Sequence, residues 1–265
     1  TAVVATRPYV NALVNTIEHI ILKSDETQHP LLRRPESMKK VALIVVSGDK
    51  GLCGAYNHNI VKSARKFVEE RRGELETIKL YFVGRKAYEA TRHIEGIDRT
   101  LVADGWERPV SEVALELSKS LCESFEQGEI DEVFILYTVF KSAIQQSVVL
   151  DAVLPMQSIL TNVDADGNAC LGTEEQKTIE ETPFIYEPSQ TEILDALLPR
   201  AVMVHIQRSL LEGCASENGA RMTAMDNASK NAVEMINRLT LQFNRARQSA
   251  ITTELIEVVS GAEAL

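Results

Sequence analysis

Strand-like and helix-like segments alternate through the middle of the chain, between residues 38 and 155. Apolar, β-branched runs predict strands, and segments with apolar residues three and four positions apart predict helices between them. This alternation is typical of a mainly parallel sheet covered by helices on both faces, the doubly wound α/β fold class. The strands are expected at 41–47, 78–84, 99–102, 131–140 and 146–155, and the helices at 57–72, 87–93 and 110–127.

The two ends of the chain predict helices of a different kind. Residues 1–29 read as the end of a helix, which His29 and Pro30 terminate, and the polar residues 156–190 predict a linker. Residues 191–265 contain one proline and predict a helix on the order of 100 Å long. A compact domain of this size is only about 40 Å across. The helix must therefore project from the domain or fold back at a break.

Small and apolar residues form a seam along the last part of this long helix. Their steps of three and four residues are close to a coiled-coil repeat. Such a helix needs a partner along its seam, and the N-terminal helix is the obvious one, although as given it is too short. The seam consists of Met225, Ala228, Ala232, Met235, Leu239, Phe243, Ala246 and Ala250.

Composition excludes several function classes. The formal net charge of -10 argues against nucleic-acid binding, which needs clustered Lys and Arg. The chain has no apolar run near the roughly 18 residues that span a bilayer, so membrane association would go through partners. The four cysteines and five histidines are scattered, which predicts reduced thiols, no metal site and no cofactor.

A glycine turn follows the first predicted strand and precedes a helix, the place where phosphate-binding loops occur. Its spacing differs from both a Walker A loop and a dinucleotide fingerprint. A tight structural turn is the favoured interpretation, with a phosphate or nucleotide site as the alternative. No catalytic residues are assigned. The turn consists of Gly48, Asp49, Lys50, Gly51, Leu52, Cys53 and Gly54.

At this point the residues carry a family resemblance. GDKGLCG, with Asn57 close behind, resembles the GD(K/R)GLCG signature of the gamma subunit of F-type ATP synthases. The stretch from Ala220 to Leu265, ARMTAMDNASKNAVEMINRLTLQFNRARQSAITTELIEVVSGAEAL, is similar to that family's C-terminal helix almost residue for residue. YEPSQTEILDALLPR, which leads into it, also looks like the family. The resemblance covers nearly the whole chain.

The resemblance implies a Rossmann-like parallel-sheet domain with long N- and C-terminal helices wound as an antiparallel coiled coil. It implies a non-catalytic rotor shaft inside a ring of alternating alpha and beta subunits, with its foot on the membrane c-ring beside epsilon, or delta in mitochondria. Proton flow would turn the shaft and cycle the catalytic beta subunits through ATP synthesis or hydrolysis.

The same resemblance implies a peripheral position on the ATP-producing face of the mitochondrial inner membrane or the bacterial plasma membrane. A thylakoid position is less expected, because the linker carries only Cys170 where chloroplast relatives carry a dithiol switch. Family members begin with a basic helix, and TAVVATRPYV looks like the stretch just after it, so the start of the first helix is expected ahead of Thr1.

Four residues match family positions that touch the alpha and beta ring: Arg221, Arg247, Gln248 and Thr252. Arg and Gln suit polar, reversible contacts with carboxylates and backbone groups. The alternative is that all four are solvated flanks of a coiled coil. Two other functions stay open from the residues, a small-molecule enzyme using the glycine turn and a coiled-coil scaffold unrelated to ATP synthesis.

Overall fold

The computed structural model of the chain describes residues 12, 13, 16, 17, 20, 29–33, 38–94, 96–142, 145–156, 187 and 189–263. Within these residues five strands form one sheet in the order β3-β2-β1-β4-β5, which confirms the predicted α/β class. The strands are β1 (Lys40–Val46), β2 (Thr77–Val83), β3 (Asp98–Ala103), β4 (Glu132–Phe140) and β5 (Gln146–Leu154).

The sheet is mixed, whereas the resemblance predicted a parallel one. β1, β2, β3 and β4 pair in parallel, but β5 runs antiparallel to β4. A parallel pair needs a crossover of a dozen or more residues, and only residues 141–145 connect these two strands. The short connection therefore forces the edge strand to reverse.

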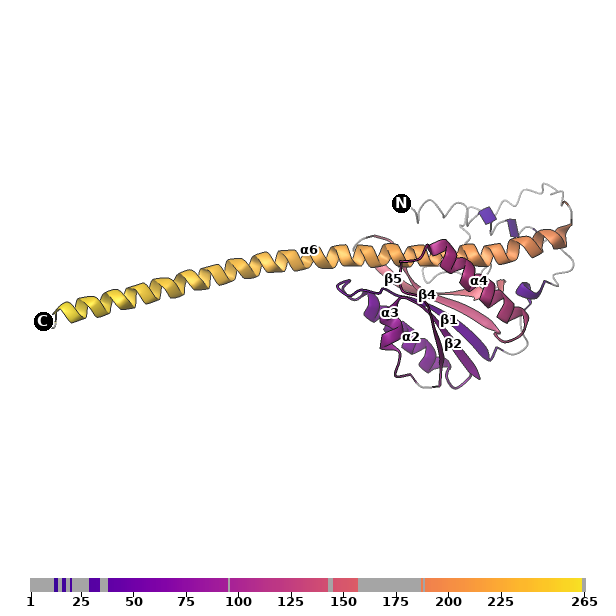
Figure 1. The fold of residues 1–265 in the computed structure, drawn as a ribbon, viewed down its shortest axis with the longest axis horizontal. Coiled ribbons are helices and arrows are strands. Elements are labelled where there is room, and N and C mark those ends of the chain that lie inside the picture. Colours follow the sequence, from indigo (N-terminus) through magenta and orange to yellow (C-terminus); the bar gives the residue numbers. More distant parts are fainter. Residues whose placement is uncertain are drawn as a thin grey trace.

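Helices cover both faces of the sheet (Figure 1). Helices α2 (Tyr56–Arg71) and α3 (Arg85–Ala90) lie on one face, while α4 (Val110–Glu126) and the first part of α6 (Gln190–Glu263) lie on the other. Because β1 is buried on both faces, its sequence is a continuous apolar run. Its side chains alternate between the two cores, with Val41, Leu43 and Val45 on the α2 side and Ala42, Ile44 and Val46 on the α6 side.

Helix α6 is continuous over 74 residues and is therefore about 110 Å long. It contains Pro199 without ending there. The first part packs on the sheet and on α4, and the last buried position is Gly219. From Met225 to Ser260 every residue is exposed. Of the two predicted alternatives the structure shows the first, a helix that projects far beyond the domain (Figure 1).

The predicted N-terminal helix falls mostly outside the described residues. Ala12, Leu13, Thr16, Ile17 and Ile20 are described as helical, and Ile17 and Ile20 are buried in the core cluster that also contains α4 and α6 side chains. A short 3-10 helix, η1 (Pro30–Leu32), follows. The predicted coiled-coil pairing lies outside the described residues, as does most of the predicted linker at 156–190.

Candidate functional site

The glycine turn is closed by the side chain of Asn57, near the start of α2. The amide of Gly48 donates a 2.9 Å hydrogen bond to Asn57 Oδ1, and Asn57 Nδ2 donates to the Lys50 carbonyl at 3.3 Å. Leu52 and Gly54 adopt positive φ angles of 65° and 57°. Two backbone groups of the turn, the Gly48 amide and the Lys50 carbonyl, are therefore hydrogen-bonded by a side chain of the same chain.

Asp49 ties this turn to the ends of the two neighbouring strands. Its Oδ1 accepts a 2.8 Å hydrogen bond from the Arg85 amide, directly after β2. Its Oδ2 lies against Gly105 in the loop after β3, where any Cβ would collide with it. Gly105 also has a φ of +59°, which favours glycine. One carboxylate thus organises the carboxyl ends of β1, β2 and β3.

The carboxylate of Glu217, on helix α6, lies over this turn. A Cβ on Gly48 would come within 2.6 Å of Glu217 Oε1, so the glycine leaves the space that the carboxylate occupies. The Glu217 side chain is 4% exposed. Trp106 Nε1 donates to its Oε2 at 2.7 Å, and Arg221 Nη2 donates to its Oε1 at 2.6 Å. A buried carboxylate with an opposite charge and a second donor is a satisfied group.

Three further polar contacts join α6 to the sheet and to α2. Glu212 Oε2 accepts a 3.0 Å hydrogen bond from the Phe140 amide, and Ser216 Oγ donates to the Thr138 carbonyl at 2.9 Å. Burial raises the pKa of the Tyr56 hydroxyl well above its usual range. That hydroxyl therefore stays protonated, and it donates a 3.1 Å hydrogen bond to the carbonyl of Gly213 on α6.

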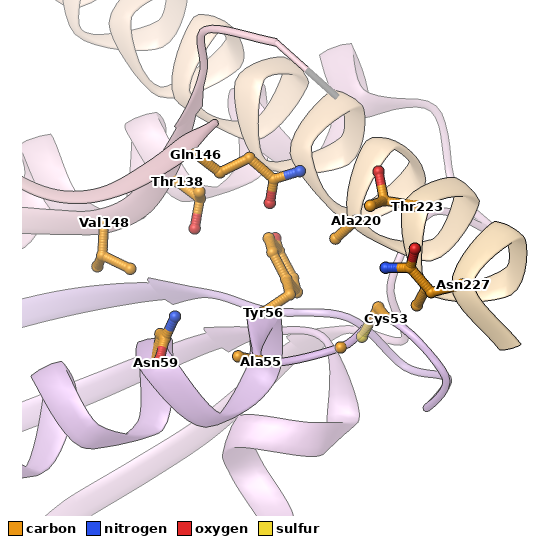
Figure 2. Close-up of a pocket in the computed structure, with 12 residues that line it drawn as sticks. Cys53, Ala55, Tyr56, Asn59, Thr138, Gln146, Val148, Ala220, Thr223 and Asn227 are labelled. Atoms are coloured by element: carbon orange, nitrogen blue, oxygen red, sulfur yellow. The ribbon is translucent and has the colours of Figure 1, made fainter. Parts of the chain in front are cut away.

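A pocket of about 310 Å³ lies between the turn, the start of α2, strands β4 and β5, and α6. Figure 2 shows residues that line it. Its lining side chains carry no formal charge, whereas a nucleotide phosphate is bound by cations and by exposed amides. Nothing in this lining favours the phosphate alternative for the turn. The residues that line it are Cys53, Gly54, Ala55, Tyr56, Asn59, Thr138, Gln146, Val148, Ala220, Thr223, Ala224 and Asn227.

The four predicted ring-contact residues are not brought together. Arg221 is anchored to Glu217 beside the domain, while Arg247, Gln248 and Thr252 lie on the projecting part of α6. Along the axis Arg221 and Arg247 are about 40 Å apart. Thr252 Oγ1 donates back to the Gln248 carbonyl at 2.8 Å, so these two share one face of the helix.

Sequence reasoning missed Glu217 and Trp106. The only signal for Glu217 is its position four residues before Arg221, the spacing of a helical ion pair. Trp106 is 111 residues away from Glu217, and no local pattern connects the two. Within the described ranges no helix is long and apolar enough to cross a membrane, and no cluster of three or more His, Cys, Asp or Glu could hold a metal ion.

Comparison with known proteins decides the family. A family model described as ATP synthase matches residues 1–265. The ATP synthase gamma chain of Geobacter metallireducens is 41% identical over 265 residues, which covers 99% of this chain and 86% of that protein. The gamma chain of Geobacter sp. strain M21 is 40% identical over 263 residues with the same coverage. This chain belongs to the ATP synthase gamma family.

Solved structures agree with the gamma-chain fold. A chain of the Euglena gracilis mitochondrial ATP synthase aligns with a TM-score of 0.59 at 19% identity, covering 99% of this chain and 92% of that one. A chain of the Tetrahymena thermophila mitochondrial ATP synthase, from its central stalk and c-ring, aligns with a TM-score of 0.54, also at 19% identity. As a gamma chain, the protein is a non-catalytic subunit of F-type ATP synthase, its central rotor stalk.

Proposed function

We propose that this gamma chain turns inside a ring of alternating alpha and beta subunits and couples transmembrane proton flow to conformational cycling of the catalytic beta subunits. One observation supports this most directly, the projection of α6 away from its domain. From Met222 to its end this helix extends for about 60 Å. A helix of that length gains most of its stability from packing an apolar face, not from propensity. It therefore requires partners.

The apolar side chains of the projecting segment support two kinds of partner. The predicted seam side chains Met225, Met235, Leu239 and Phe243 are between 41% and 65% exposed. We assign this seam to the N-terminal helix predicted at residues 1–29, in an antiparallel coiled coil. Leu255, Ile256, Val258 and Val259 are also exposed, near the tip, and suit an apolar sleeve formed by the ring.

The ring contacts are assigned to Arg221, Arg247, Gln248 and Thr252. The last three are exposed on the projecting helix, where polar side chains can form and break contacts as the shaft turns. Arg221 differs, because its Nη2 is already bonded to Glu217 and its Nη1 donates a long hydrogen bond of 3.5 Å to Asn218 Oδ1. Its remaining N–H groups can reach a ring carboxylate or carbonyl while the first contact holds the guanidinium in place.

The α/β domain, proposed as residues 38–155, would form the foot of the shaft. It would rest on the c-ring beside epsilon, or delta in mitochondria, with residues 156–190 linking it to the shaft helix at 191–265. The assembly would lie on the ATP-producing face of the mitochondrial inner membrane or the bacterial plasma membrane.

Reconstitution with alpha and beta subunits tests this function. The chain should co-purify with both subunits and raise the rate of ATP hydrolysis of the ring. Arg247→Ala and Gln248→Ala should each lower that rate by about tenfold, since each removes one or two polar contacts that change during rotation. Gln242→Ala is the matched control, because Gln242 is exposed on the same helix but lies about 120° around it from Gln248 and about 140° from Arg247. Equal losses in all three variants, or no co-purification, would contradict the proposal.

A further inference from the structure

The point where α6 leaves the domain would carry the greatest mechanical load in a shaft, and this inference therefore rests on the proposed function. Before this point α6 is packed on the sheet, and beyond Ala224 it has no buried residue through Ser260. Torque that enters the domain passes into the packed part of the helix, and residues 212–221 are the last turns of that part. Whatever fixes the rotational position of the helix there determines how stiffly the two parts turn together.

The hydrophobic effect itself contributes little resistance to this rotation, because it is non-directional. Hydrogen bonds resist it better, because their strength falls steeply with distance and angle. Side chains of an α-helix reach about 5 Å from its axis, so a twist of about 20° moves their ends by about 2 Å. Such a movement would take the 2.7 Å contact between Trp106 and Glu217 out of hydrogen-bond range.

Glu212, Ser216 and Glu217 are three α6 side chains with polar contacts to the domain, and of these three Glu217 lies furthest along the helix. The other two, Glu212 and Ser216, bond to β4 or to the residues at its end. Glu217 instead bonds to Trp106, in the loop after β3 at the far edge of the parallel strands. The helix is therefore held from two separated directions, which is the arrangement that opposes twist.

The partners of Glu217 are themselves held in place. Trp106 follows Gly105, whose backbone lies against the Asp49 carboxylate. Asp49 also accepts a hydrogen bond from the Arg85 amide. The glycine turn that contains Asp49 thus positions the indole at the same time as Gly48 leaves room for the carboxylate. We propose that Glu217, held by Trp106 over the glycine turn, is the positioning residue that fixes the rotational position of the shaft helix on the α/β domain and transmits torque between them.

The test uses the assembled complex with its ring immobilised and a magnetic bead on the foot of the rotor. Torsional stiffness between ring and foot should fall by about twofold in Glu217→Gln and in Trp106→Phe, because one of the anchoring directions is weakened. The double variant should lose little more than either single one, since both changes act on one contact. In Trp106→Phe, which leaves the pair of Glu217 and Arg221 in place, ATP hydrolysis without load should stay close to that of the unmodified complex.

Asp226→Asn is the matched control. Asp226 pairs with Lys230 at 2.7 Å and i,i+4 spacing, as Glu217 pairs with Arg221. Both side chains of the Asp226–Lys230 pair, however, are exposed on the projecting helix. This variant should keep full stiffness. Unchanged stiffness in Glu217→Gln and Trp106→Phe would overturn the proposal. A parallel fall of stiffness and unloaded hydrolysis in Trp106→Phe would also overturn it, because it would assign this contact to folding or assembly alone.

Amide hydrogen exchange on the isolated full chain separates this proposal from the proposed function. Exchange at residues 212–221 should become about tenfold faster in Glu217→Gln and stay unchanged in Asp226→Asn. Equal exchange rates in the two variants would overturn the proposal that Glu217 fixes the helix to the domain. If the unmodified chain does not assemble with alpha and beta subunits, the proposed rotor function fails, while the exchange result still decides whether Glu217 holds the helix.

Discussion

Gly213→Ala tests how closely the shaft helix approaches the sheet. Gly213 lies on α6 opposite Val46 of β1, and an added Cβ would come within 2.7 Å of Val46 Cγ1. Val46 is fully buried and β-branched, so it has little freedom to move away. A Cβ on Gly213 would also lie 3.6 Å from the Tyr56 hydroxyl, which bonds to the Gly213 carbonyl. The substitution must therefore push helix and sheet apart.

The expected loss is about 2 kcal/mol. Overpacking a core costs about 1–3 kcal/mol, and weakening the Tyr56 hydrogen bond costs about 1 kcal/mol. Alanine returns about 1 kcal/mol, because it is the better helix former. Urea unfolding followed by the fluorescence of Trp106, the one tryptophan of the chain, measures the difference.

Two further variants make this prediction specific. Gly73→Ala is the control, since nothing lies within 4 Å of its Cβ position, and it should be neutral or slightly stabilising. Val46→Ala alone should cost about 2–3 kcal/mol, but combined with Gly213→Ala the loss should be at least about 1 kcal/mol smaller than the sum. Strict additivity, or a Gly213→Ala chain as stable as the unmodified one, would refute the close-approach argument.

Three other predictions test separate parts of the molecule. Burial lowers the pKa of His205 to about 4, so as the pH falls the unfolded chain binds a proton before the folded chain does. The free energy of unfolding should therefore fall by about 2 kcal/mol from pH 6.5 to pH 5. In urea unfolding, His205→Leu should show a smaller change of this free energy with pH. Asn57→Ala removes the contacts to Gly48 and Lys50 and should lower the unfolding free energy by about 1–2 kcal/mol in the same assay, with Asn57→Asp losing less. Val258→Lys, at an exposed position near the tip assigned to the ring, should leave the unfolding free energy of the isolated chain within about 0.5 kcal/mol but weaken co-sedimentation with alpha and beta subunits.

The strands and helices of the domain were predictable because their signals are local. β1 and β4 are apolar runs buried on both faces, and α4 was placed within one residue of its observed end. The direction of β5 was not signalled by its own residues. It depends on the length of the connection at 141–145, which the sequence contains but which the strand pattern alone does not weigh.

The contact between Trp106 and Glu217 was not predictable, because the two residues are distant in sequence. Trp106 and Glu217 each look ordinary in their local context, an exposed-loop aromatic and a helical acid. Only the sheet order brings the loop after β3 and the last buried turns of α6 to one place. The glycine turn itself was visible, but its spacing could say only which phosphate motifs it lacks.

The position of α6 gives that turn a physical meaning. In open α/β sheets, ligands bind outside the carboxyl ends of the strands where the strand order reverses, here between β1 and β4. Helix α6 crosses this place and contributes Glu212, Ser216 and Glu217 to it. A carboxylate of the chain therefore occupies a position where related folds hold an anionic ligand. Helix α6 therefore fills the edge of the sheet where a small molecule could bind. In the proposed function this same helix continues into the shaft.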